Sequence, residues 1–178
     1  MLKNFVLTLT GPDRIGIVDE VTGVLLERGG NVEVSRMVRL GGEFAVLMLV
    51  AMPSEGFTHL ETALESLKDK GYQITTTQAE RPAAELRPGW LRYRIQVHGA
   101  DHEGIIHQVS HYLSQHGVNI ESMDSETTPA PISGSPLFAM TAQVVVPPEL
   151  ALAEWEAGLE RIGTRLNVEI DVAASKQA

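Results

Sequence analysis

The sequence predicts an α+β protein made of two copies of one βαββαβ module, each an antiparallel sheet with helices on one face. The main observation is a repeat, because Gly11–Val18 returns 88 residues later as Gly99–Ile106. In both copies an apolar, strand-like run leads into Asp-x-x-Gly, and a segment with helical periodicity follows. Gly-x-Asn then opens a further strand, at Asn31 in the first copy and at Asn119 in the second.

The repeat divides the chain into two domains and a linker. We expect the first domain in residues 1–80 and the second in residues 90–174, joined by a linker at residues 81–89 that contains two prolines. Modules of about 80 residues bury a limited share of their extended-chain surface. We therefore expect the modules to pack against each other or to form a homo-oligomer.

Composition and charge narrow the classes of function. The 178 residues include no cysteine, which excludes disulfides, thiolate catalysis and cysteine metal sites. The net charge is −9 and both halves are acidic, so direct binding to nucleic acid is disfavoured. The first residues do not resemble a signal peptide, and no apolar run reaches the roughly 18–20 residues of a membrane span. We expect a cytoplasmic protein.

The first copy begins with a strand and a helix. Phe5–Thr10 is predicted to be a strand because every second residue is a large apolar one. A helix is expected after Asp13 and is ended by Gly29 and Gly30. Its apolar stripe consists of Val18, Val21 and Leu25.

A hairpin follows, with strands at Asn31–Leu40 and Glu43–Met52. Gly41 and Gly42 supply the positive φ angles of a tight type I′ turn. Residues 44–51 are apolar on both faces of their strand, so we expect the outer face to be covered by the partner module or by a second chain.

The first copy is completed by an amphipathic helix and a strand at Tyr72–Thr77. The helix is predicted from Phe57, Leu60, Leu64 and Leu67. The second copy, from Leu91 to about Val172, repeats this order, and the same spacing appears in Leu152, Trp155, Leu159 and Ile162. About six residues are inserted within 127–136. We expect a loop there, and the part from Pro129 to Pro136 could contact a partner.

The two Asp-x-x-Gly loops are the candidate binding sites. A helix N-terminus offers unpaired amides and partial positive charge, and a glycine lets a ligand approach the backbone. Two functions remain open for Asp13 and Asp101: ligand contact, or an ordinary helix N-cap, which we favour.

These motifs resemble paired ACT domains, regulatory modules of ferredoxin-like fold that sense small ligands, often amino acids. The resemblance is based on two motifs that occur in each copy: Gly-x-Asp-x-x-Gly-Ile at the first loop and Gly-x-Asn-Ile/Val after the first helix. Two copies without a catalytic domain, and Pro131-x-Ser133-Gly134-x-Pro136 in the second hairpin, are similar to the glycine cleavage system transcriptional repressor family. That resemblance implies a DNA-binding activator as protein partner and glycine as ligand.

In ligand-binding ACT domains the first loop and the start of the second strand enclose the amino acid. The resemblance therefore implies a set of ligand-binding residues in each copy. In the first copy they are Asp13, Arg14, Gly16, Ile17, Asn31 and Val32; in the second they are Asp101, Gly104, Ile105, Asn119 and Ile120. Because Glu103 brings negative charge near the amides of the second loop, the first copy is the better candidate if only one binds.

The histidines suggest a second chemistry. Five of the six fall within residues 98–116, and His107 and His111 share one helical face. We interpret them as a solvated face, with a metal site as the alternative.

No nucleophile constellation, phosphate loop or dinucleotide motif is present, so we expect no catalytic residue, no cofactor and no enzyme. The favoured function is a regulator that senses a small amino acid and signals to a protein partner. The alternatives are a regulatory subunit or scaffold that contacts a metabolic enzyme without binding a ligand, and a metalloregulator.

Overall fold

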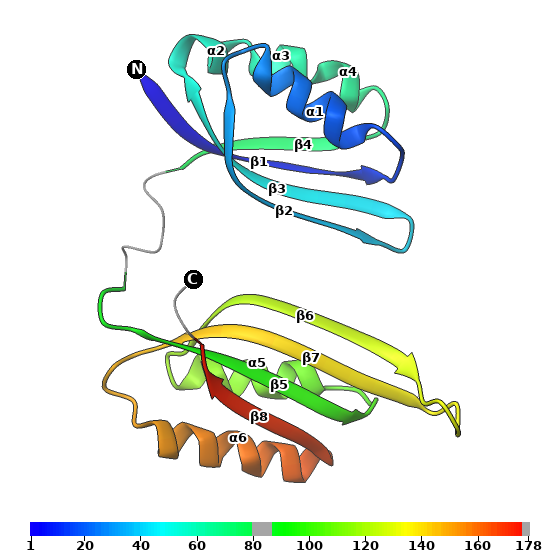
Figure 1. Ribbon diagram of the computed structural model, residues 1–178, viewed down its shortest axis with the longest axis vertical. Coiled ribbons are helices and arrows are strands. Elements are labelled where there is room, and N and C mark those ends of the chain that lie inside the picture. Colours follow the sequence, from blue (N-terminus) through cyan, green and yellow to red (C-terminus); the bar gives the residue numbers. More distant parts are fainter. Residues whose placement is uncertain (80–86, 176–178) are drawn as a thin grey trace. The chain divides into compact units, whose positions relative to one another are not determined.

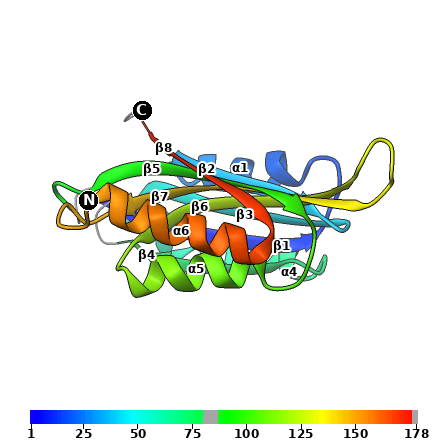
Figure 2. The same cartoon turned by 90° about the horizontal axis from the view of Figure 1, so that it is seen from below.

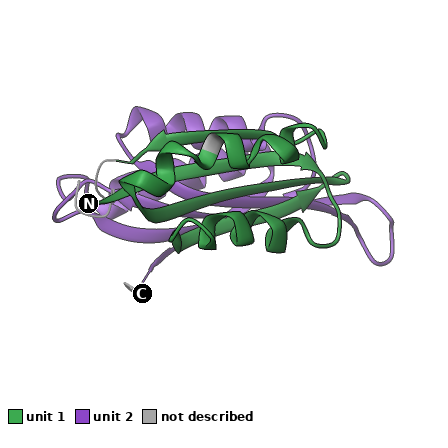
Figure 3. Ribbon diagram, turned by 90° about the horizontal axis from the view of Figure 1, so that it is seen from above, with its two compact units in different colours: residues 1–86 green, residues 87–178 purple. Residues whose placement is uncertain are grey.

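The computed structural model describes residues 1–79 and 87–175. The chain divides into two compact units, with the division between residues 86 and 87 (Figure 3). Residues 81–86 of the predicted linker lie outside the described residues. Each unit is a four-stranded antiparallel sheet with its helices on one face, as the sequence predicts (Figure 1).

The first module follows the predicted βαββαβ order, with one change. Its sheet has the strand order β2-β3-β1-β4. The first strand, β1, therefore lies inside the sheet, and the last strand, β4, pairs with it at one edge. The elements are β1 (Leu2–Pro12), α1 (Ile17–Leu26), β2 (Asn31–Leu40), β3 (Glu43–Pro53), α2 (Ser54–Thr58), α3 (Leu60–Ala63), α4 (Glu65–Lys68) and β4 (Gln73–Gln78).

The change concerns the predicted second helix, which is divided into the three short helices α2, α3 and α4. The interruptions fall at His59 and Leu64, where the backbone leaves ideal helical geometry. Leu60, Leu64 and Leu67 are nevertheless fully buried. The apolar spacing therefore predicted correctly which side chains pack into the core, but the prediction of one continuous helix was wrong.

The second module repeats the topology with strand order β6-β7-β5-β8 and a continuous second helix. Its elements are β5 (Leu91–Ala100), α5 (Ile105–Gln115), β6 (Asn119–Pro129), β7 (Pro136–Val146), α6 (Leu152–Leu166) and β8 (Val168–Ala174). Trp155, Leu159 and Ile162 of α6 are buried in the core, as the repeat of the apolar spacing predicts.

The two hairpins differ as the insertion predicts, but the extra residues are used differently. In the first, Gly41 and Gly42 both have positive φ (58° and 90°), which confirms the tight turn. In the second, β6 and β7 stay paired as far as Pro129 and Pro136 (Figure 2). The predicted loop at 127–136 is therefore wrong at its ends, because the hairpin gains one further strand pair there. Residues 130–135 form the loop and hold most of the insertion.

Each sheet buries one face under its own helices and forms a separate core. In the first module the core face of β3 is closed by α1 and the short helices, and Met48 and Val50 are fully buried. Leu47 on the outer face of the same strand is 49% exposed. That a partner module or a second chain covers this outer face stays a prediction.

Glycines, not aspartates, begin the first helix of each module. Gly16 (φ 88°) precedes α1 and Gly104 (φ 91°) precedes α5, and neither helix has a capping side chain. The favoured assignment of Asp13 and Asp101 as N-caps is wrong. Both aspartates instead continue the pairing of the preceding strand with β3 or β7, because their backbone N–H groups donate to the carbonyl oxygens of Gly42 and Pro136, each at 3.0 Å.

His102 ties the β5–α5 loop to the end of α6. Its Nε2 lies 2.6 Å from the carbonyl oxygen of Leu166 and its Nδ1 lies 3.1 Å from that of Glu103. Carbonyl oxygens only accept, so both contacts are hydrogen bonds only when both ring nitrogens carry protons. The contact with Leu166, followed by that with Glu103, raises the pKa of His102 above its ordinary value of 6.5.

Within residues 1–79 and 87–175, no helix has the length and apolar content that a membrane crossing needs.

Two glycines of the first module provide a matched test of the left-handed turn. Gly16→Ala forces a Cβ into φ 88° and should lower the free energy of unfolding by about 1–2 kcal/mol, although nothing lies within 4 Å of the new atom. Gly23→Ala, inside α1 and equally unobstructed, should raise it by about 0.5–1 kcal/mol. Urea unfolding of both variants measures the difference, and a Gly16→Ala protein as stable as Gly23→Ala would contradict the expectation.

The contribution of the His102 hydrogen bonds to stability should depend on pH. Since its pKa is higher in the folded chain than in the unfolded chain, its contribution to stability is complete below pH 6.5 and is lost as the pH rises through the folded pKa. The stability difference between the natural chain and His102→Asn should therefore shrink between about pH 6 and pH 9. NMR titration of the imidazole checks the cause directly, and a pKa at or below 6.5 would refute it.

Candidate functional site

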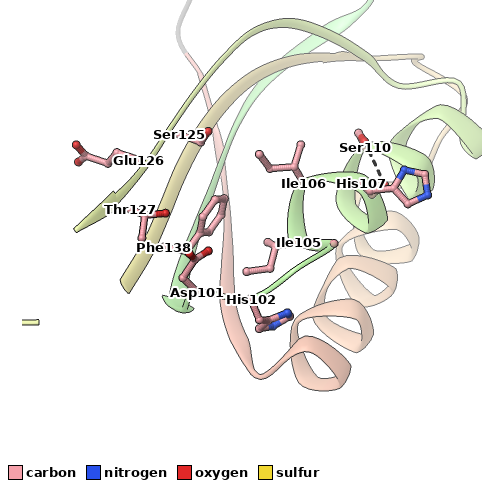
Figure 4. A pocket seen from close by; sticks show the side chains of 11 residues that line it. Asp101, His102, Ile105, Ile106, His107, Ser110, Ser125, Glu126, Thr127 and Phe138 are labelled. Atoms are coloured by element: carbon pink, nitrogen blue, oxygen red, sulfur yellow. Dashed lines mark hydrogen bonds between the residues drawn. The ribbon is translucent and has the colours of Figure 1, made fainter. Parts of the chain in front are cut away.

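A pocket of about 670 Å³ lies at the N-terminus of α5 in the second module (Figure 4). It is formed by the β5–α5 loop, the first turns of α5, the end of β6 and one residue of β7. Its lining residues are Asp101, His102, Gly104, Ile105, Ile106, His107, Ser110, Ser125, Glu126, Thr127 and Phe138. Three residues that the sequence predicts for ligand binding, Asp101, Gly104 and Ile105, therefore meet in one cavity.

The backbone at this helix end is suited to an anion. The first hydrogen bond of α5 runs from the N–H of Gln108 to the oxygen of Gly104, at 2.9 Å. The N–H groups before Gln108 have no partner inside the helix, and no side chain caps them. Together with the helix dipole they favour a negatively charged group at this end of the pocket.

Polar side chains from β6 face the helix across the pocket. Ser125 and Thr127 pair with Met140 and Phe138, both of which point into the core, so their hydroxyl groups lie on the helix side of the sheet. Glu126 pairs with Ala139 on the other face, and Figure 4 shows its carboxylate turned away from the cavity. The hydroxyls can donate and accept hydrogen bonds without adding charge.

The remaining side chains set the shape of the pocket. His102 is held toward α6 by Leu166, so it closes one side of the cavity. Ser110 donates to the carbonyl oxygen of His107 at 3.1 Å. Phe138 is 6% exposed and gives the floor an apolar ring, while the Asp101 carboxylate lies at the rim beside it.

The equivalent loop of the first module carries a different set of charges. Arg39 on β2 lies 3.5 Å from the carboxylate of Asp13. Arg14 is engaged within the protein, because its guanidinium pairs with Glu20 in the first turn of α1 and lies 5.6 Å above the ring of Tyr72. Lys70 also contacts Glu20, and these hydrogen bonds, first from Lys70 and then from Arg14, lower the pKa of that carboxyl group.

The predicted isoleucines cannot offer side chains to a ligand. Ile17 and Ile105 are each 2% exposed and belong to the two cores. Any role they have in binding is limited to their backbone N–H groups at the start of each helix.

The predicted residues of the second strand lie elsewhere in each module. Asn119 and Ile120 begin β6 beside the C-terminal end of α5, a helix of 11 residues that spans roughly 16 Å. Asn31 and Val32 take the same position in the first module. A single module does not bring them to the Asp-x-x-Gly loop, and their role in binding stays a prediction.

Sequence reasoning missed the pocket residues on the far half of the second strand. Ser125 and Thr127 come six or more residues after Asn119, and the antiparallel course of the hairpin returns them to the N-terminus of α5. The alternation of small hydroxyl residues in that strand is the signal that could have shown them. In the first module Arg39 was missed in the same way, since it pairs with Phe44 as Thr127 pairs with Phe138.

The preference for the first copy was based on Glu103. In the structure Glu103 is exposed and is not among the residues that line the pocket. The reason for preferring the first copy is thereby removed, although the preference itself stays a prediction.

The chemistry available at this pocket is binding. It combines unpaired amides, two hydroxyls, a carboxylate and an apolar floor, an arrangement that can hold a small zwitterion. Among the residues that the structure describes, no three His, Asp or Glu side chains are gathered to hold a metal ion.

Comparisons with known proteins agree with this fold. The ACT domain model matches residues 3–77. The Escherichia coli (strain K12) glycine cleavage system transcriptional repressor is 27% identical over 164 residues, which cover 92% of this chain and 86% of that protein. A UPF0237 protein of Methanococcus maripaludis is 38% identical over 68 residues, covering 37% of this chain and 76% of that protein.

Two solved structures share the whole architecture. A protein from Galdieria sulphuraria is 35% identical with a TM-score of 0.88, covering 99% of this chain and 100% of its own. A structure assigned as a glycine cleavage system transcriptional repressor has a TM-score of 0.71 at 21% identity, covers 99% of each chain and shares the fold. The chain therefore belongs to the ACT domain family, as a tandem ACT-domain protein related over nearly its whole length to glycine cleavage system transcriptional repressors.

Proposed function

We propose that this chain is a non-enzymatic regulator that binds a small amino acid and passes the signal to a protein partner. The observation that supports it most directly is the pocket at the N-terminus of α5. Its volume of about 670 Å³ is in the range of small-molecule sites. The pocket has separate partners for the two charges of a free amino acid.

The carboxylate of the ligand would lie against the unpaired amides of Gly104, Ile105 and Ile106, where the helix dipole is favourable. The ammonium group would then meet the carboxylate of Asp101 and the hydroxyls of Ser125 and Thr127. Phe138 and Ile106 line the apolar part of the cavity, where the side chain of the amino acid would pack. A second site of the same kind is proposed in the first module, where Arg39 adds a cation beside the loop of Gly16.

The name of one relative suggests which process the regulator controls. The Escherichia coli relative is named as a transcriptional repressor of the glycine cleavage system, which suggests glycine as the ligand and gene expression as the output. A net charge of −9 argues against direct contact with DNA. We therefore propose a cytoplasmic protein that acts through a transcriptional activator as partner, by stabilising one arrangement of its two modules when the ligand is bound.

A scaffold that contacts a metabolic enzyme without a ligand is the second candidate. It is favoured by the exposed apolar side chains on the outer face of the first sheet. Val34, Val38 and Leu47 are each about half exposed, and Leu40 is 70% exposed. A surface of this kind is typical of a protein contact.

The experiment is a binding study with glycine and a panel of other amino acids, by calorimetry and thermal unfolding. A ligand at 100 times its dissociation constant should stabilise the chain by about 2.7 kcal/mol. Thr127→Val removes one hydroxyl at nearly constant shape and should weaken binding roughly tenfold, because a charged group loses a hydrogen bond. Thr128→Val is the control, since Thr128 lies on the same strand but pairs with Leu137 on the other face.

Asp101→Asn separates the two halves of the proposed ligand site. It should weaken glycine binding more than Thr127→Val does, and it should not weaken binding of a simple carboxylate such as acetate, which has no ammonium group to lose its partner. If no amino acid binds, the sensor function is refuted and the scaffold is favoured. If glycine binds equally to the natural chain, Thr127→Val and Asp101→Asn, this pocket is not the site.

A further inference from the structure

A second cavity, separate from the amino-acid pocket, lies between α5 and α6 on the helical face of the second module. This groove has a volume of about 450 Å³. From α5 it is lined by His107, Gln108, His111, Tyr112 and Gln115, and from α6 by Gly158, Arg161, Ile162 and Arg165. Nothing in the proposed function uses it.

The floor of the groove is fixed by Tyr112. Its hydroxyl donates to the backbone oxygen of Trp155 at 3.2 Å, so the ring spans from α5 to α6. The ring passes directly over Gly158, where a Cβ would stand 1.7 Å from the hydroxyl oxygen. Burial raises the pKa of Tyr112, so the hydroxyl stays protonated. The groove therefore has a rigid base.

The walls of the groove are rich in donors and contain no carboxylate. Arg161 and Arg165 are four residues apart on α6 and share one face of that helix. His107 and His111 are four residues apart on α5, with their rings stacked at 5.8 Å between centroids. In the described part of the chain, neither arginine lies within ion-pair distance of an acidic side chain.

Arg165 is held in place without being neutralised. Arg165 donates to the side-chain oxygen of Gln108 at 2.5 Å, which connects the two helices across the groove through a neutral partner. Two guanidinium groups on one helix face repel each other. The imidazoles on the opposite wall carry no negative charge that would offset this repulsion. An anion between the walls would relieve this repulsion.

This positive groove is a property of the second module and not of the repeat. At the positions of His107, Gln108 and Gln115 the first module has Asp19, Glu20 and Glu27. The protein as a whole carries a net charge of −9, and residues 90–178 contain only four arginines. Two of these four line the same groove.

We propose that the groove between α5 and α6 binds a small molecule through a phosphate group, placed between the arginines of α6 and the histidines of α5. A phosphate monoester carries close to two negative charges and three strong acceptor oxygens. Planar guanidinium groups match such oxygens with two parallel hydrogen bonds each. The groove and the amino-acid pocket are different cavities, although His107 lines both.

The geometry favours a single phosphate group over a nucleic-acid backbone. Binding to a phosphate backbone needs many cations along a stripe, and its affinity rises with each contact. Here two arginines and two histidines surround one concave space in an otherwise acidic protein. A dicarboxylate is the nearest chemical competitor, so the experiment includes one.

The test uses the full-length chain, with pyrophosphate as the probe and calorimetry as the readout. We expect saturable binding, weakened roughly tenfold by Arg161→Gln and again by Arg165→Gln, because each loses a charge-assisted hydrogen bond. Arg94→Gln is the matched control, since it removes the same charge from the exposed face of β5. Circular dichroism melting of each variant shows that the module still folds.

Three results would overturn the proposal. The first is an absence of binding by the natural chain. The second is a loss of affinity in Arg94→Gln as large as in Arg161→Gln, which would indicate a general effect of charge. The third is a preference for another ligand: succinate that binds more tightly than pyrophosphate, or Zn²⁺ that binds more tightly than pyrophosphate and requires His107 and His111. Glycine binding is measured on the same variants, so that failure here and failure of the amino-acid site remain distinct.

Discussion

The left-handed glycine between the first strand and first helix of each module is the constraint on which the rest of the fold depends. After β1 and β5 the chain must reverse within four residues so that a helix can cross back over the sheet. Gly16 at φ 88° and Gly104 at φ 91° make that reversal, and an L-residue would be strained there. The same turn leaves the helix without a capping side chain, so the geometry that completes the core also leaves the helix amides free to bind a ligand.

On this common frame the two modules have acquired different surfaces. In the first, the helical face is acidic at Asp19, Glu20 and Glu27, and the outer sheet face is apolar. In the second, the equivalent helical face is lined by histidine, glutamine and arginine, and the outer sheet face carries charged side chains. Duplicated modules with one fold and unlike surfaces are suited to a protein that binds more than one thing at once. A regulator that responds to a ligand and contacts a partner requires that property.

The two cavities of the second module share α5, and this gives a physical route between them. His107 lines both, and His102 and Arg165 fasten the N-terminal end of α5 to the C-terminal end of α6 through Leu166 and Gln108. A ligand in one cavity that shifts α5 against α6 would alter the other. Coupling of this kind is reciprocal, so each ligand would change the affinity for the other by the same factor.

The sequence by itself determined the architecture, because apolar periodicity and glycine positions depend on local geometry and burial. The repeat, the strand order along the chain, the Gly41–Gly42 turn and the burial of Val21 and Leu25 in α1 and of Trp155, Leu159 and Ile162 in α6 were all predictable in this way. The structure alone decided the site. Thr127 and Arg39 reach the helix N-termini through antiparallel pairing, and Arg161 faces His107 through the packing of α6 on α5. These arrangements join residues up to 54 positions apart. Periodic patterns along the chain carry no information on which distant side chains the folded core brings together.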